Sequence, residues 1–170
     1  MTFIQQVVAS FIGTTFGFIF SILLFLITWL IKTYLDKKTL KKHLKREFEY
    51  DILLLQEWID EIDKILRKIT ANDKQLFSFI RYTYFQRSFI QEAFRSGLMY
   101  NSLNNEEISN LNTILRHCDI GIERYINGII HEWKTDQKPQ QEALRNFEFE
   151  KEELKKFQKH LREILSKLHK

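Results

Sequence analysis

The sequence predicts an all-helical protein, with a single N-terminal transmembrane helix followed by a cytoplasmic antiparallel four-helix bundle of long helices. Three observations predict this class. The 170 residues include only five Gly and one Pro, too few for an all-β sandwich rich in tight turns or for a disordered chain. Residues 1–31 carry no charged side chain. Most of the remaining chain repeats apolar residues at steps of three and four, which is typical of helices.

The first element is an apolar run from Val7 to Ile31. About 20 apolar residues span a bilayer, so this run is long enough to cross with some tilt. Trp29 and Tyr34 lie near one end of it, where amphipathic aromatic residues favour the membrane interface. A cleaved signal peptide would have a basic start and a shorter apolar run. Because residues 1–6 contain no Lys or Arg, we expect an uncleaved anchor over residues 1–31.

The second element is a basic stretch at residues 32–46, which holds seven basic residues against one acidic residue. The positive-inside rule places this flank in the cytoplasm and the N-terminus outside, in a cell inner membrane. Residues 47–170 hold 19 basic and 21 acidic residues, which disfavours nucleic-acid binding by the folded domain. We expect the basic side chains to contact anionic lipid headgroups. They are Lys32, Lys37, Lys38, Lys41, Lys42, Lys45 and Arg46.

Small residues recur every four positions in the membrane segment, at Ala9, Gly13, Gly17 and Ser21. Such a ridge lets helix backbones approach closely, so it predicts self-association of the membrane helix. The alternative is that small residues are simply common in membrane helices. In a ring of several copies, polar residues such as Ser10 and Thr14 would line a pore. Alternatively, Ser and Thr bond carbonyls of their own helix.

Three segments with turn-forming residues divide the rest of the chain, at 70–73, 97–105 and 135–139. Asn and Asp suit helix N-caps, Gly97 suits the position after a helix end, and Pro139 suits a first helical turn. The sequence therefore predicts helices over about 34–69, 73–96, 106–134 and 140–168. We expect residues 47–170 to form one bundle, attached to the anchor through residues 32–46.

Three of these four segments carry an apolar stripe at heptad spacing. In the first segment the stripe is Phe48, Ile52, Leu55, Ile59, Ile62, Leu66 and Ile69. In the third it is Ile108, Leu111, Leu115, Cys118, Ile122, Tyr125 and Ile129. In the fourth it is Phe147, Leu154, Phe157, Leu161, Leu165 and Leu168. No Gly or Pro separates the first segment from the membrane run, so one helix is expected to continue across both.

The second segment is instead dense in aromatic residues, from Phe77 to Phe94. In isolation it could be a strand, and its rings could form a base-stacking surface. Charges at helical spacing favour a helix whose rings fill a core or an interface. The only cysteine, Cys118, occupies a core position. It points about 100° away from His117 on a helix, so neither a metal nor another cofactor is expected.

The sequence has no Gly-rich phosphate loop, no Gly-x-Ser-x-Gly and no His-Glu-x-x-His. One pair of residues can support chemistry. Arg124 and His131 are seven residues apart, so they share a helix face, which points away from the stripe of Ile122 and Ile129. An Arg and a His with four to six residues between them are the hallmark of HEPN nucleases, and the stretch from Arg124 to His131, with six between, resembles the long form. Tyr125 departs from the polar residue that usually follows Arg.

That resemblance implies a catalytic His131 acting as general acid or base, with Arg124 stabilising phosphate charge. Arg162 and His169 have the same spacing. The whole architecture resembles the small single-span accessory proteins that accompany RNA-targeting type VI-B CRISPR effectors. These have a divergent HEPN-like domain and assemble into membrane pores that strengthen antiphage defence. The resemblance implies an oligomeric membrane effector and carries no catalytic claim.

Three functions therefore stay open. The first is a homo-oligomeric membrane protein that forms a pore or depolarises the membrane in antiviral defence. The second is a membrane-tethered HEPN-like ribonuclease that cleaves RNA without metal. The third is a structural tether whose bundle binds a protein partner through its surplus of aromatic residues.

Overall fold

The computed structural model describes residues 3–74 and 85–168, without the side chains of residues 5–10 and Ile120. Every regular element in these ranges is a helix, which confirms the predicted all-helical class. The chain divides into two compact units, Met1–Leu40 and Lys41–Lys170.

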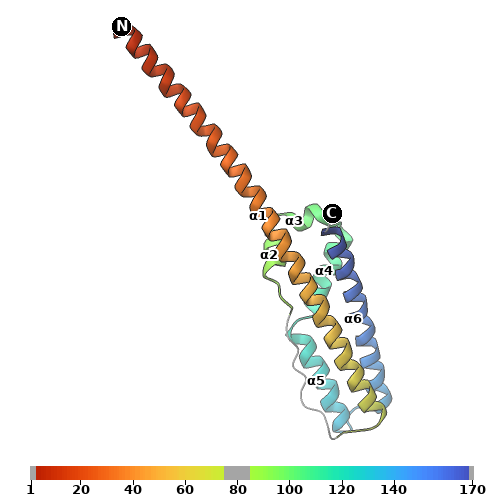
Figure 1. Cartoon of the computed structure of the whole chain (residues 1–170). Coiled ribbons are helices and arrows are strands. Elements are labelled where there is room, and N and C mark those ends of the chain that lie inside the picture. The colour runs from red at the N-terminus through yellow and green to blue at the C-terminus, as the bar shows by residue number, and fades with distance from the viewer. Residues whose placement is uncertain (1–2, 75–84, 169–170) are drawn as a thin grey trace. The chain divides into compact units, whose positions relative to one another are not determined.

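Helix α1 runs from Phe3 to Thr70 and belongs to both units (Figure 1). The helix continues without a break through residues 32–46, as expected because no Gly or Pro lies between Gly17 and its end at Thr70. In the first unit, α1 contains a stretch near the N-terminus that is long and apolar enough to cross a membrane. The predicted N-terminal apolar helix is therefore present.

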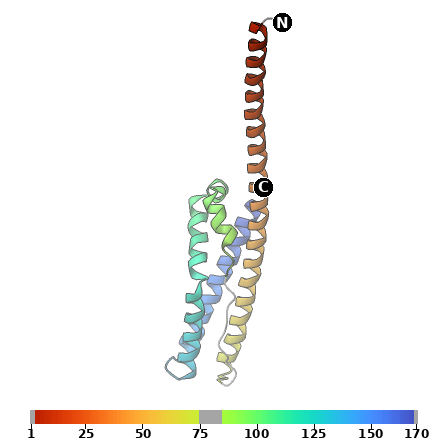
Figure 2. The ribbon, with the colours of Figure 1, turned by 90° about the vertical axis from the view of Figure 1, so that its left-hand side faces the viewer.

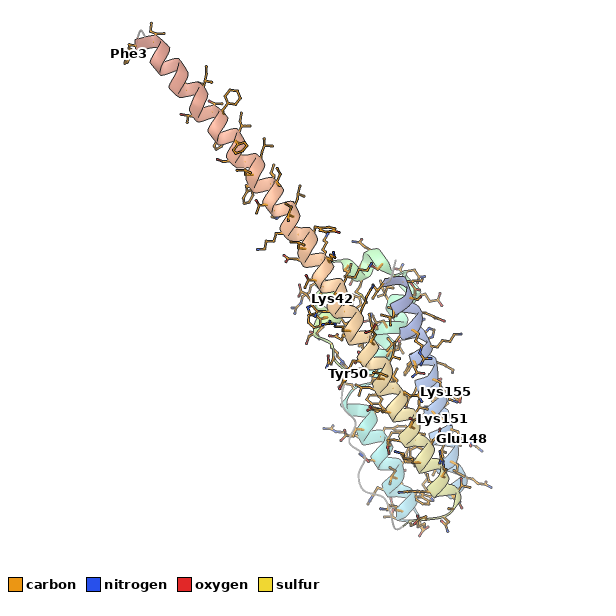
Figure 3. The ribbon with its side chains drawn as sticks, viewed as in Figure 1. Phe3, Lys42, Tyr50, Glu148, Lys151 and Lys155 are labelled. Carbon is orange, nitrogen blue, oxygen red and sulfur yellow. The ribbon has the colours of Figure 1, made fainter. Side chains whose placement is uncertain are left out.

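In the second unit, α1 packs antiparallel to α6, which runs from Gln140 to Leu168 (Figures 1 and 2). Gln158 of α6 donates a hydrogen bond to the carbonyl oxygen of Ile52 at 3.2 Å. Lys151 of α6, labelled in Figure 3, forms an ion pair with Asp63 of α1. From the first of these contacts to the second, the residue number rises in α1, from Ile52 to Asp63, and falls in α6, from Gln158 to Lys151. The two helices are therefore antiparallel.

Helices α4 (Asn105–His117) and α5 (Ile120–Lys134) follow one another and both contact α6 (Figure 2). An ion pair between Glu107 and Lys167 joins the start of α4 to the end of α6. Two short helices, α2 (Ser88–Arg95) and α3 (Leu98–Ser102), contact each other, and α3 contacts α4.

Much of the core of the second unit comes from the predicted stripes, but Tyr125 of the third stripe is 48% exposed and its predicted core position is wrong. In α1 the buried stripe residues are Phe48, Leu55, Ile59, Ile62 and Ile69. In α6 they are Phe147, Leu154, Phe157, Leu161 and Leu168. The heptad patterns thus identified the inward faces of both helices. Trp133 of α5 is the largest fully buried side chain in the described core.

The expected single helix over 106–134 is wrong, because the structure divides it into α4 and α5 at residues 118–119. Cys118 is buried, as predicted, but it caps α4 with φ −80° and ψ 45° and does not lie inside a helix. Arg87 donates hydrogen bonds to the carbonyl oxygens of Leu115 and Cys118. These carbonyls lose their helical partners at the break, and the guanidinium replaces those partners.

The expected helix over 73–96 is wrong in its bounds, because residues 73–74 and 85–87 are not helical and α2 covers only Ser88–Arg95. Residues 75–84 lie outside the described residues, with Phe77, Phe79, Tyr82 and Tyr84 among them, so the four-helix bundle stays a prediction. The loop expected over 97–105 contains α3. Gly97 follows α2 with φ +76°, the left-handed conformation expected of a residue after a helix end. Asn104 forms a reciprocal capping box with Glu107.

Candidate functional site

The ridge of small residues in the first unit is open. Gly13, Gly17 and Ser21 are exposed, and a Cβ atom added at either glycine would meet no atom within 4 Å. The side chains of Ala9 and Ser10 lie outside the described residues. Residues 11–32 are exposed throughout, so this part of the chain offers its whole apolar surface to a lipid or to another helix.

Several hydroxyl groups in the apolar stretch bond their own helix. Ser21 donates to the carbonyl oxygen of Gly17 at 2.8 Å, and Thr15 donates to that of Phe11 at 2.8 Å. This back-bonding satisfies a hydroxyl group inside a bilayer without a pore. Thr14 is exposed, and a pore-lining role for Thr14 and Ser10 stays a prediction.

The basic stretch at residues 32–46 is helical over its whole length. Its most exposed members are Lys32, Lys37, Lys38, Lys42 and Arg46, while Lys41 and Lys45 are half-buried. Figure 3 places Lys42 on α1. The helix therefore carries most of these charges to solvent, as contacts with lipid headgroups require, and those contacts stay a prediction.

Arg124 and His131 are both exposed on α5, whereas Ile122 and Ile129 on the same helix are buried. The predicted outward face is therefore present. Among the described residues, neither Arg124 nor His131 forms a side-chain hydrogen bond or an ion pair. Nothing in that part of the chain therefore positions the imidazole of His131 or neutralises the guanidinium of Arg124. The pair remains accessible to a ligand, and its catalytic role stays a prediction.

The most constrained polar side chains of the second unit are buried carboxylates that the sequence analysis missed. Glu47 of α1 is 2% exposed. Its Oε2 accepts a hydrogen bond from the N–H of Phe89 at 2.9 Å, and its Oε1 accepts one from the N–H of Ile90 at 3.0 Å. Both N–H groups belong to the first turn of α2, where helices carry unpaired donors and favour negative charge. Glu47 therefore caps α2 from another helix.

Asp51 lies one turn further along α1 and is fully buried. Its Oδ1 accepts a hydrogen bond from the N–H of Gln86 at 3.1 Å, while its Oδ2 has no hydrogen-bond partner among the described residues. The pKa of Asp51 is raised to about 8, mainly by burial and to a smaller extent by the nearby Glu47, while the Gln86 hydrogen bond and Arg87 oppose the shift. The side chain is therefore mainly neutral at pH 7.

Arg87 connects this region to the break between α4 and α5. Besides its bonds to the two carbonyl oxygens at the end of α4, its guanidinium lies 3.6 Å from the carboxylate of Asp119. Burial raises the pKa of the nearby Cys118 thiol, so Cys118 is unsuited to act as a nucleophile.

A third buried carboxylate, Glu150 of α6, is 1% exposed and lies 2.7 Å from Nε2 of His117. The edge of the His117 ring also contacts Phe157, at 5.0 Å between centroids. The hydrogen bond to Glu150 raises the pKa of His117. In the parts of the chain that the structure describes, no group of three His, Cys, Asp or Glu side chains is arranged to hold a metal ion.

A sequence signal for these carboxylates does exist. Asp51 follows Phe48 by three positions and precedes Leu55 by four, so it is in phase with the apolar stripe of α1. Glu150 stands in the same relation to Phe147 and Leu154. A charged residue in phase with a core stripe must be buried with a polar partner, which is how both could have been found.

No protein-family model matches the chain, and no significant match was found among curated proteins or solved structures.

Proposed function

We propose that this chain is a single-pass inner-membrane protein that self-associates through its membrane helix and permeabilises the membrane as an effector in antiviral defence. In this proposal the N-terminus lies outside, and the second unit is a four-helix bundle in the cytoplasm. The observation that carries the proposal is the apolar stretch of α1, whose side chains are exposed from residue 11 to residue 32.

The exposed stretch supports membrane crossing for two physical reasons. Soluble proteins rarely leave such a large contiguous apolar surface in water. A helix also satisfies its own backbone hydrogen bonds, which is a condition for crossing a bilayer. The basic stretch at residues 32–46 supports the cytoplasmic location of the second unit through the positive-inside rule.

Self-association is supported by the ridge at Gly13 and Gly17, where nothing within the chain occupies the space beside either glycine. A second copy of the helix would fill that space and gain close backbone packing. In a ring of such helices, Ser10 and Thr14 would face the lumen. The antiviral role depends on the resemblance to accessory proteins of type VI-B CRISPR effectors.

The first test is the native mass of the full-length protein in mild detergent, combined with reporter fusions at each terminus in cells. We expect a defined species of many copies, an external N-terminus and a cytoplasmic C-terminus. Ion conductance in liposomes then tests the pore. A monomer at every concentration would overturn self-association. Full biological activity after replacement of residues 1–31 by an unrelated anchor would instead favour a tether that binds a protein partner.

A HEPN-like ribonuclease is the second candidate, because Arg124 and His131 are both exposed on one face of α5. His131 would act as general acid or base, and Arg124 would stabilise phosphate charge. We expect metal-independent RNA cleavage that His131→Ala abolishes and that Arg162→Ala, at an exposed position on α6, leaves intact. Cleavage that persists in His131→Ala would exclude this site.

A further inference from the structure

A pocket of about 370 Å³ lies in the second unit where α5 begins beside α6. Arg116 and His117 line it from the end of α4, Tyr125 from α5, and Phe149 from α6. This volume is at the lower end of the roughly 300–1,000 Å³ found for small-molecule sites, so it suits a ligand with one ring system and one charged group.

The polar side of the pocket combines two basic side chains, Arg116 and His117, with one buried carboxylate, Glu150, which also lines it. Glu150 lies 2.7 Å from Nε2 of His117, and this hydrogen bond fixes the imidazole and raises its pKa. Arg116 is exposed at the rim and forms no ion pair within the described residues. A guanidinium beside an imidazole is a suitable pair of groups for binding a phosphate, since arginine binds phosphate oxygens with two parallel hydrogen bonds.

The apolar side of the pocket consists of aromatic rings that are open to solvent. Tyr125 is 48% exposed and Phe149 is 62% exposed, although both lie at the edge of a packed core. Aromatic side chains that line a site and face solvent are suited to stack on a flat heterocycle, as they do in proteins that bind single nucleotides of a strand. Ile122, which is buried, completes this side.

From these two sides together we infer that the pocket binds a nucleoside monophosphate. Arg116 and His117 hold the phosphate, while Tyr125 and Phe149 stack on the base. The site lies wholly within the second unit, so binding requires neither a membrane nor a second copy. It is therefore independent of the proposed membrane assembly, and either can fail without the other.

A glycine pair provides a matched test of the location. Gly121 lines the pocket, and Gly128 lies two turns further along the same face of α5, outside the pocket lining. An added Cβ would meet no atom within 4 Å at either position. Leucine at both positions should therefore be compatible with the helix, and it also removes the unfavourable helix propensity of glycine.

The experiment is calorimetric titration of the full-length protein in detergent with AMP, GMP, CMP and UMP, alongside adenosine and inorganic phosphate. We expect at least one monophosphate to bind at least about tenfold more tightly than either partial ligand, a difference of about 1.4 kcal/mol. Gly121→Leu and Arg116→Gln should each weaken binding at least about tenfold, while Gly128→Leu and Arg145→Gln, an exposed position on α6, should leave it unchanged.

Three outcomes would overturn the inference. The first is no binding of any monophosphate at millimolar concentration. The second is unchanged binding in Gly121→Leu. The third is binding of inorganic phosphate as tight as that of the monophosphates, which would leave the aromatic rings without a role. Circular dichroism of each variant, matched to the unaltered protein, separates loss of binding from loss of folding.

Discussion

The carboxylate of Glu47 on α1 accepts a hydrogen bond from the backbone N–H of Ile90 on α2 at 3.0 Å, across 43 residues of sequence. The residue that precedes α2, Arg87, makes no side-chain cap of its own. The N-terminus of α2 is therefore stabilised by a neighbouring helix, and the position of α2 depends on α1.

Replacement of Glu47 should destabilise the second unit. Glu47→Ala leaves the N–H groups of Phe89 and Ile90 buried or partly buried without an acceptor, which costs about 1–3 kcal/mol, and removes a charge that favours the helix N-terminus. Chemical denaturation of the full-length protein in detergent, followed by circular dichroism, measures the loss. Glu49→Ala is the matched control, because Glu49 is exposed on the same helix, and its effect should stay within about 0.5 kcal/mol. Equal effects in both variants would contradict the capping role.

Asp51 should make stability depend on pH. Its pKa is raised from an ordinary value of 3.8 to about 8, so between these values the folded state keeps a proton that the unfolded chain releases. The free energy of unfolding therefore falls as pH rises through this range. The stability that the protonated Asp51 contributes at low pH is lost above about pH 8.

Asp51→Asn should remove that dependence while its amide oxygen still accepts from Gln86. At pH 9 we expect the variant to be more stable than the unaltered protein by at least about 1.4 kcal/mol, the equivalent of one pKa unit, and the advantage should shrink towards pH 5. Thermal unfolding from pH 5 to 9 measures the difference. His117 contributes its own pH dependence to both proteins, so only the difference between them is diagnostic. A difference that does not change with pH would show that Asp51 titrates normally.

Arg87 should be replaceable by neither alanine nor lysine. Its guanidinium bonds two carbonyl oxygens, of Leu115 and Cys118, and lysine cannot reproduce this forked geometry. We expect Arg87→Lys to cost about 1–3 kcal/mol, since at least one partly buried carbonyl would lose its donor. Arg95→Lys, at an arginine whose side chain is 77% exposed, is the control and should be near neutral. If Arg87→Lys matches that control in chemical denaturation, the guanidinium does not hold the break between α4 and α5.

The glycine ridge should be needed for assembly and not for folding. Gly13→Leu with Gly17→Leu should abolish the oligomer, because the new side chains prevent close approach of helices but meet nothing within their own chain. Native mass in detergent measures the copy number. Thr15→Leu adds bulk to the opposite face of the same helix and should keep the oligomer. Loss of assembly in Thr15→Leu alone would place the contact on another face.

The fold could be predicted wherever one helix face decides burial. The stripes of α1 and α6 identified inward residues such as Leu55 and Leu161, because apolar spacing reports directly on the buried face. The break at Cys118 could not be predicted in this way. The apolar pattern keeps its phase across residues 118–119, and the break is stabilised by Arg87, which lies outside the pattern.

Less of the candidate site than of the fold could be predicted from the sequence. Spacing alone placed Arg124 and His131 on the outward face of α5, and that part is confirmed. The pairing of His117 with Glu150 depends on the packing of α4 against α6, which no local pattern encodes. Glu47 could not be recognised as a cap because its partners begin 42 residues later in the chain.

The hydrogen bonds of Gln158 have a consequence for the alignment of α1 with α6. The buried core residues of both helices recur every seven positions, from Phe48 to Ile69 and from Phe147 to Leu168, so sliding one helix past the other by seven residues would restore apolar contact. Gln158 is 7% exposed and donates to Ile52, an interaction that such a slipped alignment would break. A buried amide left unpaired costs about 1–3 kcal/mol. The hydrogen bonds of Gln158 and the ion pair between Lys151 and Asp63 thus favour the observed alignment, which the apolar residues alone would not distinguish from one displaced by seven residues.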